Sequence, residues 1–414
     1  MSKTLQPVRG THDILPEEAR ARRFISDTAF GIAERYGYGE ISTPVFEFSE
    51  VFHRTLGDTS DVVSKETYTF EDRGGESLTL RPEFTAGVVR AFLSNGLQQN
   101  LPCRFGYCGP AFRYERPQKG RMRQFHQIGM ECLGVAEPLA DIETIALAWD
   151  ILCALGLKDS VVLELNSLGD NESRAAYRAA LVEYFTQHQA KLSQDSKLRL
   201  QKNPLRILDS KDEGDRAIIA NAPQMQDSFT PAAKEFFAKV TAGLSALAIP
   251  FRHNQRLVRG LDYYTHTVFE FTCDKLGAQS TVLAGGRYDG LVEMMGGQPT
   301  AGIGWAAGIE RLLIAMAVEV PAPARPVALV PLGEAAEQAS VKLAHDLRLA
   351  GISITQEASG NMGKRLKKAD KVNARAAIIF GDDELAKGVV QVKDLTTGEQ
   401  REVALAQVAS QLKN

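Results

Sequence analysis

The stretch that decides the fold is Arg113–Glu131, which reads RYERPQKGRMRQFHQIGME. It predicts a strand ending near Glu115, a basic turn with proline and glycine, and a second strand leaving from Phe125. Side chains alternate between the faces of a strand, so every second residue shares a face. One face of the second strand would carry Phe125, Gln127, Gly129 and Glu131. The other would carry Ile128, Met130 and Cys132. The second strand is therefore expected to be a pocket wall on one side and core on the other.

The first strand and the turn of this hairpin concentrate charge. Arg113 and Glu115 alternate onto one face, so a cation and an acid are expected to line the same pocket. The turn adds four cations: Arg116, Lys119, Arg121 and Arg123. Such a group of basic side chains suits phosphate. An ordinary hairpin with a solvated basic turn is the alternative for this segment. His126 faces away from Gln127, so no catalytic role is expected for it.

Two later segments carry isolated arginines beside glycine. Arg259 opens RGLDYYTHTVFE, in which glycine permits close backbone approach to a ligand and two tyrosines, Tyr263 and Tyr264, follow. Arg311 follows the glycine-rich stretch that begins at Gly302 and lies off the apolar stripe of its predicted helix. That stretch is not inside a βαβ unit, which disfavours a dinucleotide site, and no phosphate-loop sequence is present. Any ATP site would therefore depend on arginines, although each alone also fits a surface ion pair.

Pro82 is expected to start a helix, with Glu83 and Thr85 in its first turn. An acid there complements the positive end of the helix dipole, and capture of a ligand ammonium group together with Gln127 is the functional alternative. The histidines lack metal-ligand spacing, so no metal is assigned to protein side chains.

Bulk composition indicates an ordinary globular protein of two or three domains. The chain has 414 residues, 44% hydrophobic and 24% charged, and a net charge of −3, which argues against a general nucleic-acid coat. Its five cysteines show no CxxC pairing, so neither a disulfide framework nor a zinc site is expected. Without an apolar leader or a membrane-length apolar run, we expect a cytoplasmic protein with no membrane partner.

The domain boundaries follow changes in pattern along the chain. Residues 1–320 mix helices and strands, among them a short strand predicted over Ile41–Phe46. Polar helical patterns at about 171–254 interrupt this mixture and indicate a helical insertion. Pro321–Pro326 reads as a stiff linker. Residues 327–414 alternate strands and helices, with a last helix predicted from Val403. This alternation predicts a small α/β domain with a mainly parallel sheet.

These motifs together resemble the histidyl-tRNA synthetases, which are class II aminoacyl-tRNA synthetases. The resemblance rests on Arg81–Thr85, Phe112–Phe125, Arg259–Tyr264 and Gly302–Leu313, and it extends over essentially the whole chain. It implies an α+β catalytic domain with an antiparallel sheet flanked by helices, in a homodimer whose interface contains the Glu17–Tyr36 helix and the strand reaching Pro44. The C-terminal domain would bind the anticodon of a histidine tRNA.

The resemblance also implies the chemistry and the residues that carry it. Histidine and ATP would form histidyl-adenylate, with Arg113 and Arg259 as the catalytic cations and Mg²⁺ bound to the ATP phosphates. The ATP contacts would be Arg113, Glu115, Arg121, Phe125 and Arg311. The histidine contacts would be Glu83, Thr85, Arg113, Gln127, Glu131, Arg259, Tyr263 and Tyr264. The acceptor end of the tRNA would meet Arg116, Gln118 and Arg123.

Two other functions fit parts of the pattern. A regulatory subunit of ATP phosphoribosyltransferase shares the sheet, but such proteins generally lack the anticodon domain and the Arg259–Tyr264 motif. A non-catalytic tRNA-binding module would tolerate loss of Arg113, Arg259 or Arg311, and all three are present.

Overall fold

The computed structural model describes residues 4–56, 66–118, 120–210, 212–257, 263–277 and 280–413. The chain divides into two compact units, residues 1–320 and 321–414. Among the described residues, no helix combines the length and the apolar character that crossing a bilayer requires.

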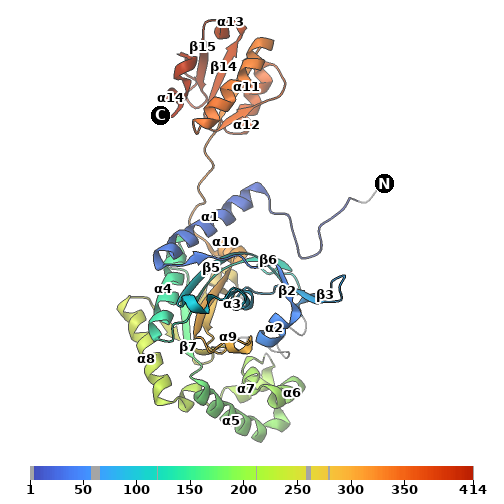
Figure 1. The fold of residues 1–414 in the computed structure, drawn as a ribbon, viewed down its shortest axis with the longest axis vertical. Coiled ribbons are helices and arrows are strands. Elements are labelled where there is room, and N and C mark those ends of the chain that lie inside the picture. Colours follow the sequence, from blue (N-terminus) through green and yellow to red (C-terminus); the bar gives the residue numbers. More distant parts are fainter. Residues whose placement is uncertain are drawn as a thin grey trace. The chain divides into compact units, whose positions relative to one another are not determined.

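The first unit is built on an eight-stranded sheet with the order β1-β5-β6-β11-β10-β9-β7-β8 (Figure 1). The strands are β1 Gly39–Glu40, β5 Cys103–Phe112, β6 Gln124–Leu133, β7 Val162–Ser167, β8 Phe251–His253, β9 Thr265–Thr272, β10 Thr281–Arg287 and β11 Gly302–Gly308. The six central strands pair antiparallel, and the short outer strands β1 and β8 pair parallel. The predicted antiparallel sheet flanked by helices is confirmed.

Four helices cover one face of this sheet. They are α1 Pro16–Ala33, α4 Pro138–Ala154, α8 Pro231–Ala246 and α10 Ile309–Ala315. The main hydrophobic core lies beneath them and contains Ile128, Met130 and Cys132, as the alternation along β6 predicts. The opposite face is covered in part by α2 Ser49–Leu56, α3 Thr85–Ser94 and α9 Leu291–Met294. The rest of that face is not covered by these three helices.

A small antiparallel sheet lies at the periphery of the unit, in the order β2-β4-β3 (Figure 1). Its strands are β2 Phe46–Phe48, β3 Tyr68–Glu71 and β4 Ser77–Leu80. The predicted single strand over Ile41–Phe46 is wrong, because the chain crosses there from β1 to β2. The Arg81 guanidinium donates to the carbonyl oxygens of Thr43 and Pro44 and so takes the place of a strand partner.

The insertion between β7 and β8 is helical, with a hydrophobic cluster of its own. Its helices are α5 Asn171–Gln187, α6 Gln194–Lys202, α7 Glu213–Ile219 and α8. The insertion also contains short 3₁₀ helices at Gln189–Lys191, Pro204–Asp209 and Met225–Ser228. Elsewhere in the chain, short 3₁₀ helices occur at Glu34–Tyr36, Leu97–Asn100, Asp274–Leu276 and Leu405–Gln407. The last helix of the insertion, α8, packs on α4 and β9, so the insertion is joined to the core of the unit.

The second unit is a five-stranded sheet in the order β13-β12-β14-β15-β16, with the first three strands parallel. The elements are β12 Val327–Leu332, α11 Glu334–Leu349, β13 Ile354–Gln356, α12 Met362–Lys371, β14 Ala376–Gly381, α13 Asp382–Ala386, β15 Val389–Asp394, β16 Gln400–Ala404 and α14 Val408–Lys413. The α/β pattern agrees with the prediction, but the sheet is not mainly parallel, because two of its four strand pairings are antiparallel. The final helix begins at Val408 and not at the predicted Val403. β16 is an edge strand whose single buried side chain, Val403, provides no alternation to read.

Candidate active site

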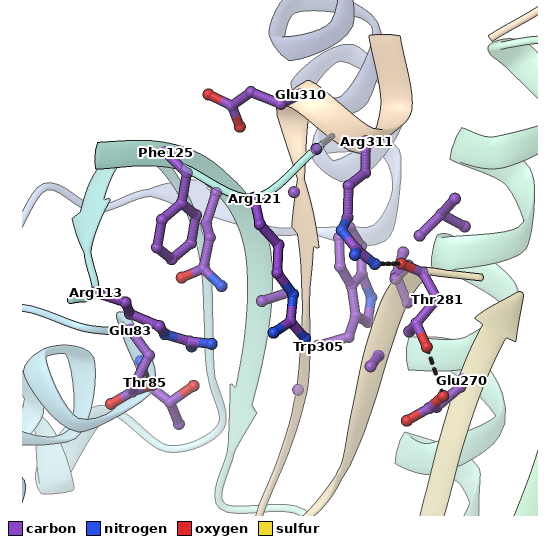
Figure 2. A pocket seen from close by; sticks show the side chains of 18 of the residues that line it. Glu83, Thr85, Arg113, Arg121, Phe125, Glu270, Thr281, Trp305, Glu310 and Arg311 are labelled. Carbon is purple, nitrogen blue, oxygen red and sulfur yellow. Dashed lines mark hydrogen bonds between the residues drawn. The ribbon is translucent and has the colours of Figure 1, made fainter. Parts of the chain in front are cut away.

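A pocket opens on the free face of the large sheet, between the β5–β6 hairpin and α10 (Figure 2). It has a volume of about 460 Å³. Its lining includes ten of the predicted site residues: Glu83, Thr85, Arg113, Glu115, Arg121, Phe125, Gln127, Tyr263, Tyr264 and Arg311. Arg259 lies outside the described residues. The pocket therefore collects side chains from segments as far apart in the chain as Glu83 and Arg311.

Arg113 and Glu115 lie just beyond the end of β5, and both face the pocket. Nε of Arg113 donates to the carbonyl oxygen of Pro82 at 2.9 Å, and its guanidinium carbon is 5.3 Å from the centre of the Phe125 ring. Arg121 reaches back across the turn, where its Nη1 is 2.7 Å from Oε2 of Glu115. Glu115 is thus already paired in this state.

Arg311 approaches from the opposite side, on the first turn of α10. Its Nη1 donates to the carbonyl oxygen of Thr281 on β10 at 2.5 Å. Burial lowers the pKa of Arg311, and the positive charge of Arg121 lowers it further. An anion placed between these two guanidinium groups would relieve that repulsion.

The prediction that Glu83 lies in the first turn of a helix is wrong, because α3 begins two residues later, at Thr85. Its carboxylate accepts the backbone N–H groups of Thr85 at 2.6 Å and Ala86 at 2.9 Å. Burial raises the pKa of Glu83, and these two hydrogen bonds oppose that rise. Oε1 of Gln127 is also buried here and has no hydrogen-bond partner among the described residues. A donor-rich group such as an ammonium would satisfy both.

Glu131, a predicted site residue, does not line the pocket itself. It is almost fully buried behind Thr85, Tyr288 and Gly304, which do line the pocket. Its carboxylate accepts three hydroxyl groups, from Thr85 at 2.6 Å, Tyr107 at 3.2 Å and Tyr288 at 2.5 Å. Burial raises the pKa of Glu131 to about 8, against these hydrogen bonds. Gly304 leaves the room that the carboxylate fills, since a Cβ there would be 1.7 Å from Oε2. Glu131 and its three hydroxyl donors thus form a polar cluster beneath one end of the pocket.

Sequence reasoning missed the two tyrosines that hold Glu131. Tyr107 is on β5, and alternation places it with Glu131 once the β5–β6 register is known, since it lies opposite Gly129. Tyr288 directly follows Arg287, whose side chain is fully buried and pairs with Asp141 and Asp289. The Arg287 guanidinium also donates to the carbonyl oxygens of Val135 and Glu137. Arg287 can be noticed in the sequence, within the segment GGRYDG, but the sequence does not indicate which residues it pairs with.

The predicted tRNA contacts lie on the outer turn of the hairpin. Arg116 and Gln118 are exposed, and Gln118 forms an isolated bridge with Arg121. Arg123 is stacked over the Tyr114 ring at 4.0 Å, and its backbone N–H donates to the carbonyl oxygen of Gly10. Arg123 is thus tied to the N-terminal segment, while the first two are free to meet a large partner.

The antiparallel sheet, the hairpin over it and the arginine-lined pocket are those of a class II aminoacyl-tRNA synthetase. Residues 10–312 match the family model described as histidyl-tRNA synthetase, and residues 326–414 match an anticodon binding domain. The chain belongs to the histidyl-tRNA synthetase family.

Individual relatives agree over nearly the full length. The chain is 60% identical to the histidine–tRNA ligase of Rhodospirillum rubrum, with 97% of each chain covered. It is 56% identical to that of Gluconacetobacter diazotrophicus, covering 99% of this chain and 98% of the relative. The solved apo histidyl-tRNA synthetase of S. aureus superposes with a TM-score of 0.86 at 35% identity, covering 99% of this chain and 100% of that one. These relatives support an enzyme that charges tRNA rather than a regulatory subunit.

Proposed function

We propose that the pocket joins L-histidine to ATP and then to the cognate histidine tRNA. The histidine carboxylate attacks the α-phosphate, a new O–P bond forms, and the bond to the β-phosphate breaks to release pyrophosphate. The 3′-terminal adenosine of the tRNA then takes the histidyl group and releases AMP. The observation that carries this proposal is one pocket that is lined by arginines and has the buried Glu131 behind its lining residues Thr85 and Tyr288.

Arg113 is proposed to hold the α-phosphate and the attacking carboxylate. Its Nε is fixed by the Pro82 carbonyl oxygen, so the remaining donors are presented to the pocket without further ordering. Preorganised donors of this kind stabilise charge that develops in the transition state. Arg259, outside the described residues, is proposed as the second cation at the same centre.

Phe125 and Arg311 are proposed to enclose the adenine from two sides, with Glu115 at its amino edge. Arg121 would reach the distal phosphates after leaving Glu115. That exchange is feasible because the Arg121 side chain is 42% exposed, and such pairs contribute about 0–1 kcal/mol. In Figure 2 Arg113 and Arg311 approach from different sides, with Arg121 between them in that view.

The ammonium group of histidine is assigned to Glu83, Thr85 and Gln127, and its imidazole to Glu131 with Tyr263 and Tyr264. The Thr85 hydroxyl donates to Glu131, so its oxygen remains an acceptor for an ammonium N–H. A site that pairs both imidazole nitrogens leaves buried polar groups unsatisfied by an apolar competitor. Discrimination of about 10⁴ then requires no editing.

Mg²⁺ is proposed to arrive on the ATP phosphates. In the described part of the chain, His, Cys, Asp and Glu side chains do not gather in threes or more as a metal cage would require. Mg²⁺ commonly keeps several waters and binds through phosphates with one or two carboxylates, which suits the isolated acids of this pocket.

The anticodon would be bound by the second unit and the acceptor end by Arg116, Gln118 and Arg123. One face of α12 gathers Lys364, Lys367, Lys368 and Lys371 around a shallow hollow. Lysines in this arrangement neutralise a phosphate backbone.

A cytoplasmic location is proposed because all five cysteines are free.

A homodimer is proposed from the small sheet. Strand register places Phe46, Leu80 and Tyr68 in one row and Phe48, Leu78 and Phe70 in the next. These six side chains share one face, and its three phenylalanines are exposed. An apolar ladder of this kind commonly marks an interface. A second copy of this chain is the proposed occupant, since the face continues from the segment through Pro44 that the resemblance assigns to dimer contact.

The test is ATP–pyrophosphate exchange with each amino acid in turn, without tRNA. Exchange with histidine alone is expected. Arg113→Ala should lower the exchange rate by about 10²–10³, the loss typical of a transition-state donor. Arg104→Ala is the matched control, because this β5 arginine pairs with Glu143, away from the pocket, at 3.3 Å. No exchange with any amino acid, from folded protein, would favour the regulatory-subunit function instead.

A further inference from the structure

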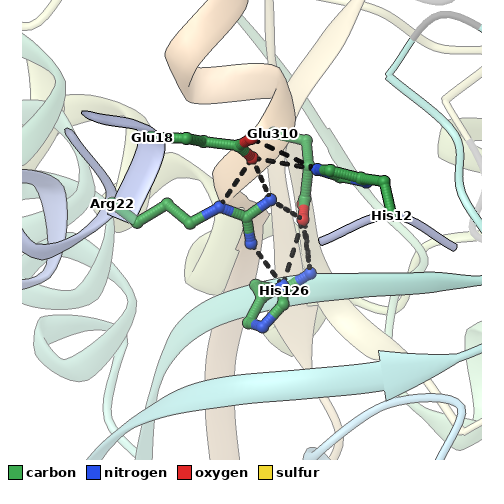
Figure 3. A network of polar contacts seen from close by, with 5 residues as sticks. All are labelled: His12, Glu18, Arg22, His126 and Glu310. Carbon is green, nitrogen blue, oxygen red and sulfur yellow. Dashed lines mark hydrogen bonds and ion pairs between the residues drawn. The ribbon is translucent and has the colours of Figure 1, made fainter. Parts of the chain in front are cut away.

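A polar network lies at the adenine side of the pocket and extends onto the helix-covered face of the sheet (Figure 3). Its member Glu310 also lines the pocket. Its members are His12, Glu18, Arg22, His126 and Glu310. They come from the N-terminal segment, α1, β6 and α10, and none has a role in the chemistry proposed above. We call this set the α1–α10 network.

Glu310 extends the contact between β6 and β11 beyond the end of their ladder. The last paired residues are Gln127 and Gly308, after which the chain turns into α10. Both carboxylate oxygens of Glu310 lie 3.0 Å from the backbone nitrogen of His126, the next residue along β6. The side chain thus accepts an N–H beyond the point where backbone pairing stops.

Arg22 fixes that carboxylate from α1. Its Nη2 is 3.0 Å from Oε1 of Glu310 and 2.6 Å from Oε1 of Glu18, and its Nη1 is 2.5 Å from Nδ1 of His126. The side chains of Arg22 and Glu310 are 9% and 11% exposed. Burial raises the pKa of Glu310, but the hydrogen bonds of His126 and the charge of Arg22 bring it below its usual value. The pair is therefore ionised and shielded from water, where removal of one partner is costly.

Sequence adjacency links this network to the pocket. Phe125 directly precedes His126 and points to the other face of β6, while Arg311 directly follows Glu310. Phe125 and Arg311 are the two side chains proposed to enclose the adenine. They are thus the sequence neighbours of His126 and Glu310, which contact each other. A change at that contact would alter the gap between Phe125 and Arg311.

We propose that Glu310 and Arg22 are positioning residues for ATP: they hold Phe125 and Arg311 at the spacing that accepts an adenine ring. The proposal rests on the adenine site proposed above. The effect is expected to be confined to the nucleotide, because the histidine end is organised separately, by Glu131 and its hydroxyl donors beneath the pocket lining.

The test is Glu310→Gln in the full chain, assayed by ATP–pyrophosphate exchange. Glutamine keeps the size of the side chain and removes the charge that Arg22 and the His126 N–H share. The KM for ATP is expected to rise about five- to thirty-fold, while the KM for histidine changes less than about twofold. Arg22→Met, which keeps the aliphatic stem, should give the same split by an independent route if Glu310→Gln does not fold.

Tyr36→Phe is the matched control, since it removes the 2.6 Å hydrogen bond from Tyr36 to Asp150 on α4 without contact to α10. It should leave both KM values unchanged. Phe125→Ala separates the two proposals. If it raises the KM for ATP and the network variants do not, the positioning role is overturned. If Phe125→Ala has no effect either, the adenine site itself is wrong. An equal change in both KM values with a lowered Tm would mean a merely structural network.

Discussion

At the scale of single residues, the pocket lining rests on a buried acid, Glu131, whose side-chain hydrogen-bond partners among the described residues are all hydroxyl groups. Glu131 is held by Thr85, Tyr107 and Tyr288, whose hydroxyl groups are neutral donors. Three neutral hydrogen bonds offset only part of the cost of burying a charge. That is the physical reason why burial dominates and the pKa rises to about 8.

This raised pKa predicts a pH dependence of stability. The folded state binds the Glu131 proton more tightly than the unfolded state, where the pKa is near 4.5. The contribution to stability is therefore complete below pH 4.5 and is lost as the pH rises toward 8. Relative to Glu131→Gln, the wild type should lose on the order of 3 kcal/mol between pH 5 and 8.

Urea unfolding of both proteins across this pH range measures the difference directly. Above pH 8 the two curves should run parallel, because Glu131 is then ionised in both states. Parallel curves from pH 5 upward would mean that the buried carboxyl keeps an ordinary pKa.

At the scale of elements, the small β2-β4-β3 sheet has its polar and apolar faces reversed from the usual order. The inner face contains Glu47, which pairs with Arg90, and Thr79, which bonds to Ser49 and Thr69. The outer face carries the two apolar rows headed by Phe46 and Phe48. An antiparallel sheet normally turns its apolar face to the core, so the reversal points to a partner outside the unit.

Phe48→Asp is predicted to weaken the proposed dimer, raising its dissociation constant at least about 100-fold, because a charge would enter a desolvated apolar ladder. Sedimentation velocity over a concentration series measures this. Leu198→Asp is the control, since Leu198 on α6 is also highly exposed and outside that face. A wild-type monomer at all concentrations, or a Phe48→Asp dimer of unchanged strength, would contradict the assignment of this face.

At the scale of the whole molecule, the chain separates adenylate chemistry from anticodon binding. The first unit contains the pocket with its lining, and the second has hydrophobic clusters of its own around Val327, Ile378 and Ala377. Because each unit has hydrophobic clusters of its own, each is expected to fold without the other.

A chain ending at residue 320 is therefore predicted to keep histidine-dependent ATP–pyrophosphate exchange within about threefold. Its kcat/KM for charging the histidine tRNA should fall by at least about 100-fold, because the proposed phosphate contacts of α12 are lost. Parallel exchange and aminoacylation assays distinguish the two. Loss of both activities from a folded fragment would show that the second unit supports the first step as well.

Much of this molecule could be predicted from sequence because its signals are local. Alternation along Phe125–Cys132 assigned the core face correctly, but of the predicted pocket face only Phe125 and Gln127 line the pocket. The helix predicted for Glu17–Tyr36 appears as α1 and the short 3₁₀ helix after it. Local signals failed where a distant side chain decides the backbone. The Arg81 guanidinium displaces the strand expected at Ile41–Phe46, and the Glu83 carboxylate caps α3 from outside it.

The sequence by itself determined the fold class, the family and ten of the 24 residues that line the pocket, since motif order and side-chain period need no partner to be read. Only the tertiary structure decided how those residues are supported. Tyr107 and Tyr288 reach Glu131 only through strand register, and Arg22 reaches Glu310 only because α1 lies beside α10. The physical reason is that hydrogen bonds and buried charges depend on distances across space, which spacing along the chain does not encode.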